Sequence, residues 1–421
     1  MTPFLWLCLM GGLAIFSSTM SKNPALPLFI HSLGVDEGTL GFIAAASTVV
    51  GIVASLPAGM LSDLWGRRRV ILLSMVVFAT APFLYLLVRA PWHLVLVRFY
   101  HGLATAMLGP VALAAVADTF QEERGERMGW YSSATMVGRF LAPTIGGLLI
   151  PSTLPFDHAQ AELRTGLGED FYWVYLGCGA AGILALLAAL RLPRLDQVTR
   201  PESPTTRWAT MRRELGLILT NRNLLLTSGM RAAQYFAFGA VETFLPLHLS
   251  GLGWGPRLIG PLFTAQVLVT VLTKPLMGRL SDRWGRRWPI VTGLLVGAGA
   301  MAAMPWIHAW WPMVALTALF GLGVAAVTAS TSALVSDLSR AAAYGASLGA
   351  LSSVMDVGHS TGPMVTGLLV AAWGYGPAFT LVAAVLVVCA AIFVTFTFPK
   401  APTRFQLSGR WTGYPKRRNQ L

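Results

Sequence analysis

The sequence predicts an all-α membrane protein in which about twelve transmembrane helices form two pseudo-symmetric bundles of six. The first observation behind this fold class is composition, because 55% of the 421 residues are hydrophobic and only 12% are charged. Soluble proteins carry about twice that share of charged residues. The second is a series of apolar runs close to the roughly twenty residues that a helix needs to cross a bilayer. The third is an internal repeat, whose landmarks recur about 219 residues apart.

The apolar runs form twelve predicted spans separated by polar loops. They cover residues 4–30, 39–61, 70–89, 92–116, 127–150, 171–191, 223–249, 258–277, 288–308, 310–335, 343–372 and 376–398. A polar, basic and proline-containing stretch separates the sixth run from the seventh. We therefore expect an N-terminal bundle at 1–192, a cytosolic linker at 193–222, a C-terminal bundle at 223–398 and a basic cytosolic tail at 399–421.

The net charge of +13 is distributed unevenly along the chain. Basic chains often bind nucleic acid, but here Lys and Arg concentrate in alternate loops and in the tail, so we expect no nucleic-acid partner. Because positive charge is retained on the cytoplasmic side, both termini should be cytoplasmic and the number of spans even. The first run lacks a basic leader and a cleavage site, which indicates a permanent span. The scarcity of Lys relative to Arg suggests a bacterial source, so we expect a multi-pass protein of a bacterial inner membrane.

The repeat is clearest in a short charged stretch, Gly59–Val70, which recurs at Gly278–Ile290. The matching positions are Gly59, Asp63, Gly66, Arg67 and Arg68 in the first copy and Gly278, Asp282, Gly285, Arg286 and Arg287 in the second. Other pairs with nearly the same spacing are Pro27 with Pro246, Asp118 with Asp337, and Gly147 with Gly367. An even number of spans per half makes this a parallel repeat, which suits the rocking of two bundles around a central site.

The pattern Gly-x-Leu-x-Asp-x-x-Gly-Arg-Arg in Gly59–Val70 resembles the signature loop between the second and third helices of the major facilitator superfamily. Arg98 and Gly102 match a second motif of that family, Arg-x-x-x-Gly on the fourth helix. A third motif, on the fifth helix, is matched by Gly138, Pro143, Gly146 and Gly147, with Ala142 in place of its central glycine. The resemblance covers about residues 4–398 and implies a twelve-helix transporter working by alternating access. The third motif is associated with the drug/proton antiporter branch, which implies efflux.

Two interpretations of Gly59–Val70 stay open. The resemblance implies an inner gate, in which pairings of Asp63 hold the two bundles closed on the cytoplasmic side and break during transport. Alternatively, the arginines anchor the protein by the positive-inside rule, while Asp63 caps a helix start and pairs with Arg67 or Arg68. In both interpretations Gly59 and Gly66 would permit close approach and positive φ in a tight turn.

Small residues around Pro143 form one face of the fifth predicted span, and Gly362, Pro363 and Gly367 repeat this pattern in the eleventh. Such faces are typical of tight helix packing in membranes. The functional interpretation adds that the packed face controls the side to which a central cavity opens.

Charges inside the predicted spans mark candidate functional sites, because each costs free energy to place there. The cations are Lys22, Arg98, Arg139, Arg231 and Lys274, and the acids are Glu242 and Asp356. Glu242 and Asp356, with His359 as a third candidate, could couple transport to protons, since such groups can take up and release a proton on either side. The alternative is a static ion pair of Glu242 with Lys22 or Arg231.

Lys22 and Glu242 nearly coincide under the repeat, which places both at similar depths beside a central cavity. We expect that cavity to be lined by Lys22, Asn23, Arg98, Arg139, Glu242 and Gln266. The resemblance implies that Arg98 modulates the proton-coupling site. The alternative is that Arg98 pairs with helix-end carbonyls.

The leading functional hypothesis is proton-coupled export of small amphiphilic molecules. The alternative is a carrier of an organic anion or acidic metabolite bound through Lys22 and Arg98, because five interior cations outnumber two acids. A non-transporting membrane sensor or scaffold is the alternative from another class. No HExxH, CxxC or P-loop motif is present, so we expect neither an enzyme nor a bound cofactor or metal. The expected partners are the substrate, protons and the bilayer, and the expected state is a monomer.

Overall fold

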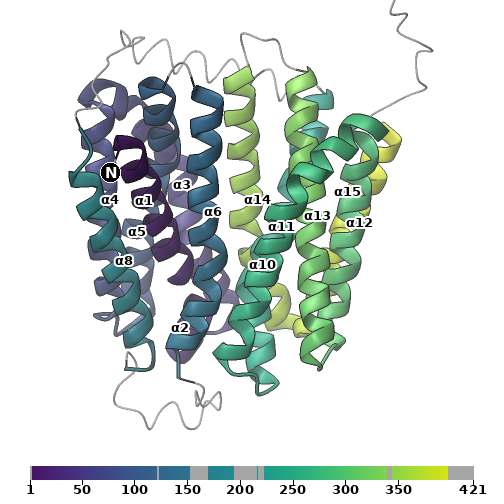
Figure 1. Ribbon diagram of the computed structural model, residues 1–421. Helices are drawn as coiled ribbons and strands as arrows, with labels where there is room; N and C mark the ends of the chain where they lie inside the picture. Colours follow the sequence, from purple (N-terminus) through teal and green to yellow (C-terminus); the bar gives the residue numbers. More distant parts are fainter. Residues whose placement is uncertain are drawn as a thin grey trace, which may run out of the picture.

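Figure 1 shows a computed structural model of the chain, which describes residues 2–120, 123–151, 169–193, 216, 222–338 and 344–396. These residues form helices joined by short turns, and no strand occurs among them. The first half comprises α1 (Pro3–Met20), α2 (Ala25–Ser32), α3 (Glu37–Trp65), α4 (Arg67–Tyr85), α5 (Pro91–Thr119), α6 (Arg124–Leu149), the 3-10 helix η1 (Glu169–Phe171) and α8 (Tyr172–Leu190). The second half comprises α10 (Arg222–Gly251), α11 (Pro256–Trp284), α12 (Arg287–Ala303), the 3-10 helix η2 (Met304–Trp306), α13 (Trp310–Leu338), α14 (Tyr344–Trp373) and α15 (Tyr375–Phe396). The predicted all-α fold class is confirmed. The predicted linker and tail lie almost entirely outside the described residues.

The first predicted span, 4–30, is one traverse made of two helices. α1 ends at Met20 and α2 begins at Ala25, so Ser21–Pro24 interrupts the helix that we expected to be continuous. Pro24 has no backbone N–H, and its ring clashes with the preceding turn of a helix, which accounts for the break. The break places Lys22 and Asn23 on a non-helical segment in the interior of the protein.

Three helices are less apolar than the others. Among the described residues, nine helical segments are long and apolar enough to span a bilayer, and α6, α10 and α14 are not among them. These three helices carry four of the interior charges, which are Arg139, Arg231, Glu242 and Asp356. Because charged groups in a membrane interior are costly unless they face a cavity or a partner, these helices are expected to border the central site.

The two halves are built alike and stand side by side, the first coloured purple to teal and the second green to yellow (Figure 1). In the first half α1 packs on α6, α3 on α5 and α4 on α8, and in the second half α10 packs on α14, α11 on α13 and α12 on α15. Between the halves, α3 packs on α14 and α6 packs on α11. Each contact in one half therefore has its counterpart in the other.

The two ends of the molecule differ in their turns. We call the end with the turns at Gly66 and Gly285 the basic-loop end, and the end with the turns at Gly34 and Gly253 the opposite end. All four glycines have positive φ, between 72° and 92°, which favours glycine in these turns. α2 and the adjoining end of α10 lie at the lower edge of Figure 1, at the opposite end.

Four glycines bring the halves into close contact toward the opposite end. A Cβ on Gly41 of α3 would lie 2.9 Å from the carbonyl carbon of Pro363 on α14, with the carbonyl oxygen closer still. A Cβ on Gly260 of α11 would lie 3.0 Å from the carbonyl carbon of Pro143 on α6. The remaining two contacts join Gly147 to Pro256 and Gly367 to Glu37. We call Gly41, Gly147, Gly260 and Gly367 the glycine seal, because any side chain there would force the halves apart.

Candidate functional site

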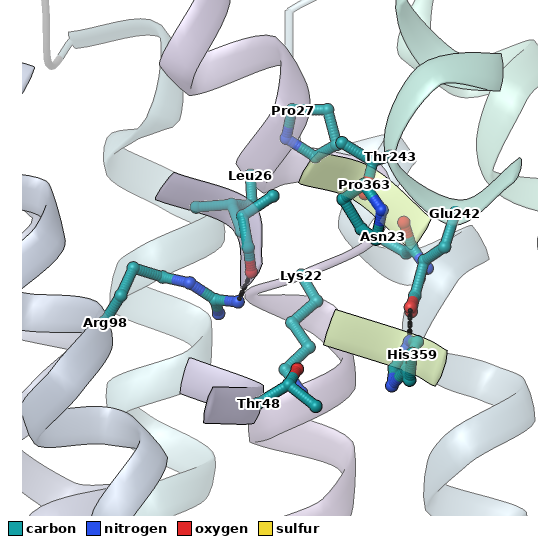
Figure 2. A pocket seen from close by; sticks show the side chains of 11 residues that line it. Lys22, Asn23, Leu26, Pro27, Thr48, Arg98, Glu242, Thr243, His359 and Pro363 are labelled. Carbon is teal, nitrogen blue, oxygen red and sulfur yellow. Dashed lines mark hydrogen bonds and ion pairs between the residues drawn. The ribbon is translucent and has the colours of Figure 1, made fainter. Parts of the chain in front are cut away.

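A pocket lies between the two halves, beside the break between α1 and α2 (Figure 2). It encloses about 370 Å³ of space outside the atoms, including the part open to solvent. The lining residues are Lys22, Asn23, Leu26, Pro27, Ala44, Thr48, Arg98, Glu242, Thr243, His359 and Pro363. The first half therefore supplies two cations, and the second half supplies a carboxylate and an imidazole.

A chain of hydrogen bonds crosses the boundary between the halves in this pocket. The Asn23 side-chain amide donates to Glu242 Oε1 over 2.6 Å, and His359 Nε2 lies 3.0 Å from Glu242 Oε2. Tyr235 and Phe238 of α10 make edge contacts with the His359 ring, at 6.0 and 5.5 Å between centroids, and so restrict its orientation. Glu242 is thus held from both sides, by one group from each half.

Asn23 and Glu242 are 219 residues apart, which is the spacing of the repeat. Under the repeat Lys22 nearly coincides with Glu242, but the residue that meets Glu242 in the structure is Asn23. Residues that are equivalent under a twofold repeat can meet only near the axis, so this hydrogen bond lies near the pseudo-twofold axis. The sequence contains a signal for this pair, because two polar residues inside apolar spans are separated by the spacing of the repeat.

Arg98 of α5 is a nearly buried cation, with 3% of its surface exposed. Its Nη2 donates to the Ala44 carbonyl oxygen of α3 over 2.6 Å, while Nε and Nη1 have no hydrogen-bond partner among the described residues. Ala44 lies within α3 rather than at its end, so the carbonyl that Arg98 meets is not a helix-end carbonyl of the kind that the alternative interpretation expected. Arg98 therefore lines the pocket with a guanidinium whose N–H groups are only partly satisfied by the described residues.

Lys22 projects between Arg98 and His359 (Figure 2). Within the described part of the chain, Lys22 forms neither a hydrogen bond nor an ion pair through its side chain. The static pairing of Glu242 with Lys22 or Arg231 is therefore not seen. Arg231 instead donates to the Ser332 hydroxyl of α13 over 2.8 Å.

Three residues expected at the site do not line the pocket. Gln266 is 2% exposed and lies against α13, where Gly321 closely approaches its backbone oxygen. Arg139 is exposed on α6, and it lies close enough to Lys22 and Glu242 to interact with them electrostatically. Asp356 lies on α14 one turn before His359, within electrostatic range of Lys22 and His359.

The basic loops are tight turns, as the sequence predicts, but they are shorter than expected. α3 continues to Trp65 and α4 begins at Arg67, so Gly66, with φ of 92°, is the only residue between them. Gly59 and Gly278 are inside helices, where an added Cβ would meet nothing within 4 Å, so neither serves a turn or a close approach. Asp63 is also inside α3 and cannot cap the start of α4, and its side chain lies outside the described residues.

The arginines of the two loops make equivalent contacts. Arg67 pairs with Asp118 of α5 at 3.1 Å, and Arg286 pairs with Asp337 of α13 at 2.7 Å and with Asp282. The next arginines donate to backbone carbonyls at the end of each half, Arg68 to Leu190 and Leu192 and Arg287 to Val394. Each of these contacts stays within one half. Among the described residues, these contacts fasten helices within a bundle.

The small residues of α6 and α14 face the helices on which they pack. A Cβ on Gly138 would overlap the Gly12 backbone of α1, and one on Gly362 would overlap the Phe236 backbone of α10. Gly146 lies against Met20 of α1, where an added Cβ would be 3.0 Å from the side chain. Together with Gly147 and Gly367 of the glycine seal, these residues set the spacing of the helices around the pocket.

Comparisons with known proteins agree with this architecture. A family model described as Major Facilitator Superfamily matches residues 7–260 and 228–414. The multidrug resistance protein MdtG of Citrobacter koseri is 25% identical over 90% of this chain and 91% of its own length. An uncharacterized MFS-type transporter of Methanocaldococcus jannaschii is 22% identical over 82% of this chain and 86% of its own length.

Two solved structures share the fold. A bacterial homolog of the human lysosomal transporter Spinster, inward-facing and unoccupied, has a TM-score of 0.77 at 17% identity, covering 93% of this chain and 96% of its own. The nucleoside transporter NupG has a TM-score of 0.71 at 15% identity, covering 95% of this chain and all of its own. At such identities these structures show the fold alone. With the family model covering nearly the whole chain, the protein belongs to the major facilitator superfamily and is a multi-pass membrane transporter of small molecules.

Proposed function

We propose that the protein is a proton-coupled secondary transporter that exports small amphiphilic compounds by alternating access, with its basic-loop end in the cytoplasm. The observation that carries this proposal is the hydrogen-bond chain Asn23–Glu242–His359 in the pocket between the halves. It joins titratable groups of one half to an amide of the other.

The hydrogen-bond chain offers a direct link between proton binding at Glu242 and the conformation of the protein. An amide donates a stronger hydrogen bond to a carboxylate than to a neutral carboxylic acid. Protonation of Glu242 therefore weakens its bond to Asn23, which holds the two halves together at the pocket. A ligand shifts a conformational equilibrium only if it binds the two states differently, and a proton on Glu242 meets that requirement.

His359 is the second proton-binding group of the site. It contacts Glu242 directly, its ring packs against Tyr235 and Phe238, and Lys22 and Asp356 lie within electrostatic range of the site. A proton shared between an imidazole and a carboxylate can pass to either group as the pocket opens to one side or the other. The arrangement of Asn23, Glu242 and His359 in this structure is one state of that cycle.

Two features support export. The small-residue motif on α6 is associated with drug/proton antiporters, and MdtG, a relative along most of the chain, is named for multidrug resistance. The relatives that are named as transporters also weigh against a non-transporting sensor. A second candidate substrate class, organic anions, is favoured by the unpaired donors of Arg98 and is developed below.

The test uses purified protein in proteoliposomes loaded with a pH-sensitive dye, with ethidium and fluorescein as cationic and anionic amphiphilic substrates. In the wild type, an imposed pH gradient should drive accumulation of the transported substrate. The enclosed pH-sensitive dye should report a counter-movement of protons. Glu242→Gln should retain substrate exchange without a gradient but lose gradient-driven accumulation, because the amide cannot bind the proton. Glu126→Gln, a carboxylate at the exposed start of α6, is the matched control and should behave as wild type. Full gradient-driven accumulation by Glu242→Gln would show that the coupling lies elsewhere.

A further inference from the structure

Charge is distributed unevenly across the pocket. Lys22 and Arg98 come from the first half, and neither forms an ion pair within the described part of the chain. The carboxylate that lines the pocket, Glu242, already accepts hydrogen bonds from Asn23 and contacts His359 on the other wall. The first-half wall therefore carries two cations that form no direct ion pair among the described residues.

Arg98 shows this most directly. Its side chain is nearly fully buried, its Nη2 donates to the Ala44 carbonyl oxygen, and the Tyr85 hydroxyl lies nearby. Buried N–H groups without partners cost free energy, more so when they carry charge. Nε and Nη1 of Arg98 are buried and have no hydrogen-bond partner among the described residues, and Arg98 lines the pocket. An oxygen acceptor from a ligand would remove this cost.

The neighbouring surface indicates what the rest of the ligand is like. Leu26, Pro27 and Pro363 line the same pocket and offer apolar contacts (Figure 2). A cationic ligand at this wall would meet two like charges in an environment poor in water, which is strongly unfavourable. A neutral ligand would leave the charges of Lys22 and Arg98 uncompensated.

We infer that the pocket binds an amphiphilic anion, whose carboxylate or similar oxyanion lies between Lys22 and Arg98 and whose apolar part packs on Leu26, Pro27 and Pro363. The inference rests on the proposed transport function and specifies its substrate class. Planar oxyanions suit a guanidinium because several N–H groups can donate to one anionic group. The anion completes the charge balance of the first-half wall and leaves Glu242 free to exchange its proton.

The experiment measures binding to the detergent-purified protein at a fixed pH of 7, by the ligand concentration that gives half-maximal thermal stabilisation. Four probes share one benzyl scaffold and differ in charge at this pH: N-acetylphenylalanine is an anion, phenylalanine a zwitterion, phenethylamine a cation and N-acetylphenylalaninamide neutral. The anion should bind at least about tenfold more tightly than the neutral amide, as expected for charge-assisted hydrogen bonds. It should also bind more tightly than the cation.

The variants locate this preference. Lys22→Gln and Arg98→Gln should each reduce the preference for the anion over the neutral amide by about tenfold, while Lys22→Arg should retain most of it. Lys274→Gln removes a cation of α11 that does not line the pocket and should leave the preference unchanged. Retained binding of the neutral amide shows that a variant is folded, and if Arg98→Gln does not fold, Lys22→Gln still decides the question.

The inference is overturned if the cation or the neutral amide binds as tightly as the anion, if none of the four probes stabilises the protein, or if Lys274→Gln removes the preference as strongly as Lys22→Gln. The proposed proton coupling fails separately, because it depends on proton movement in proteoliposomes rather than on binding at fixed pH. Anion binding without proton counter-movement would overturn the coupling and leave this inference standing. Proton-coupled transport of cations alone would do the reverse.

Discussion

The glycine seal makes a quantitative prediction about the conformational equilibrium. An alanine at Gly41 would place its Cβ 2.9 Å from the carbonyl carbon of Pro363, whereas ordinary contacts begin at 3.4 Å. α3 and α14 must therefore separate by at least 0.5 Å, and by more because the carbonyl oxygen is closer still. Overpacking of this kind costs about 1–3 kcal/mol. If the cost applies only when the opposite end is closed, the ratio of closed to open molecules falls by about 5- to 150-fold.

Spin-label distances measure this shift directly. Trp92 and Trp311 are exposed, lie at the opposite end in the two halves, and are equivalent under the repeat. Trp65 and Trp284 form the corresponding exposed pair at the basic-loop end. With labels on cysteines at these positions in a background without the native cysteines, Gly41→Ala should lengthen the opposite-end distance and shorten the basic-loop distance.

The matched control is Gly51→Ala on the same helix, where an added Cβ would meet nothing within 4 Å. This variant should give the wild-type distance distributions. Gly260→Ala, the equivalent of Gly41, should reproduce the shift because its Cβ would lie 3.0 Å from the Pro143 carbonyl carbon. Identical distributions in the wild type, Gly41→Ala and Gly51→Ala would refute the reasoning that these contacts hold the opposite end closed.

Three further predictions concern the site, the loops and a helix start. His359→Gln keeps a hydrogen-bond donor but cannot take up a proton, so substrate exchange should persist while gradient-driven accumulation falls, and unchanged accumulation would exclude His359 from coupling. Asp118→Asn should lower the melting temperature more than Asp337→Asn, because the Asp118 side chain is 30% exposed and that of Asp337 is 51% exposed, and solvent screens the more exposed ion pair more strongly. Both effects should be about 1 kcal/mol or less, and the reverse order of melting temperatures would contradict this. Hydrogen bonds from the side chain and backbone amide of Thr39 lower the pKa of Asp36, which caps α3. Because the pKa of Asp36 is lower in the folded protein, the cap stabilises the fold above the ordinary pKa of about 3.9 and loses this effect as the pH falls through the folded pKa. Asp36→Ala should therefore lower the free energy of unfolding by about 1 kcal/mol at pH 7 and by less toward pH 3.

Hydropathy and the repeat predict the fold well, because the bilayer imposes a simple length and polarity requirement on each span. The twelve traverses begin and end within a few residues of the predicted spans, as in 223–249 against Arg222–Gly251. The largest differences occur at the basic loops, where α3 and α11 extend beyond the apolar run to Trp65 and Trp284. Hydropathy locates the edge of the hydrocarbon layer, whereas a helix can continue past that edge into the polar interface.

The site was predicted less completely. The polarity of the spans is enough to single out Lys22, Arg98 and Glu242, because interior charges stand out against apolar surroundings. Which groups touch is a matter of helix rotation and of the break at Pro24, neither of which periodicity resolves to one residue. Gln266 shows the limit, since its polarity suggested a cavity position while the structure buries it against α13.

The Asn23–Glu242 hydrogen bond also restricts how such a transporter can be assembled. At a true twofold axis a residue meets its own copy, so a homodimer of identical six-helix subunits would place two carboxylates or two amides face to face. Two carboxylates would repel each other, and two amides would have no proton to exchange. Joining the halves in one chain allows the two positions to differ, so that a donor from one half meets an acid from the other. A symmetric dimer of identical halves could not present this unequal pair.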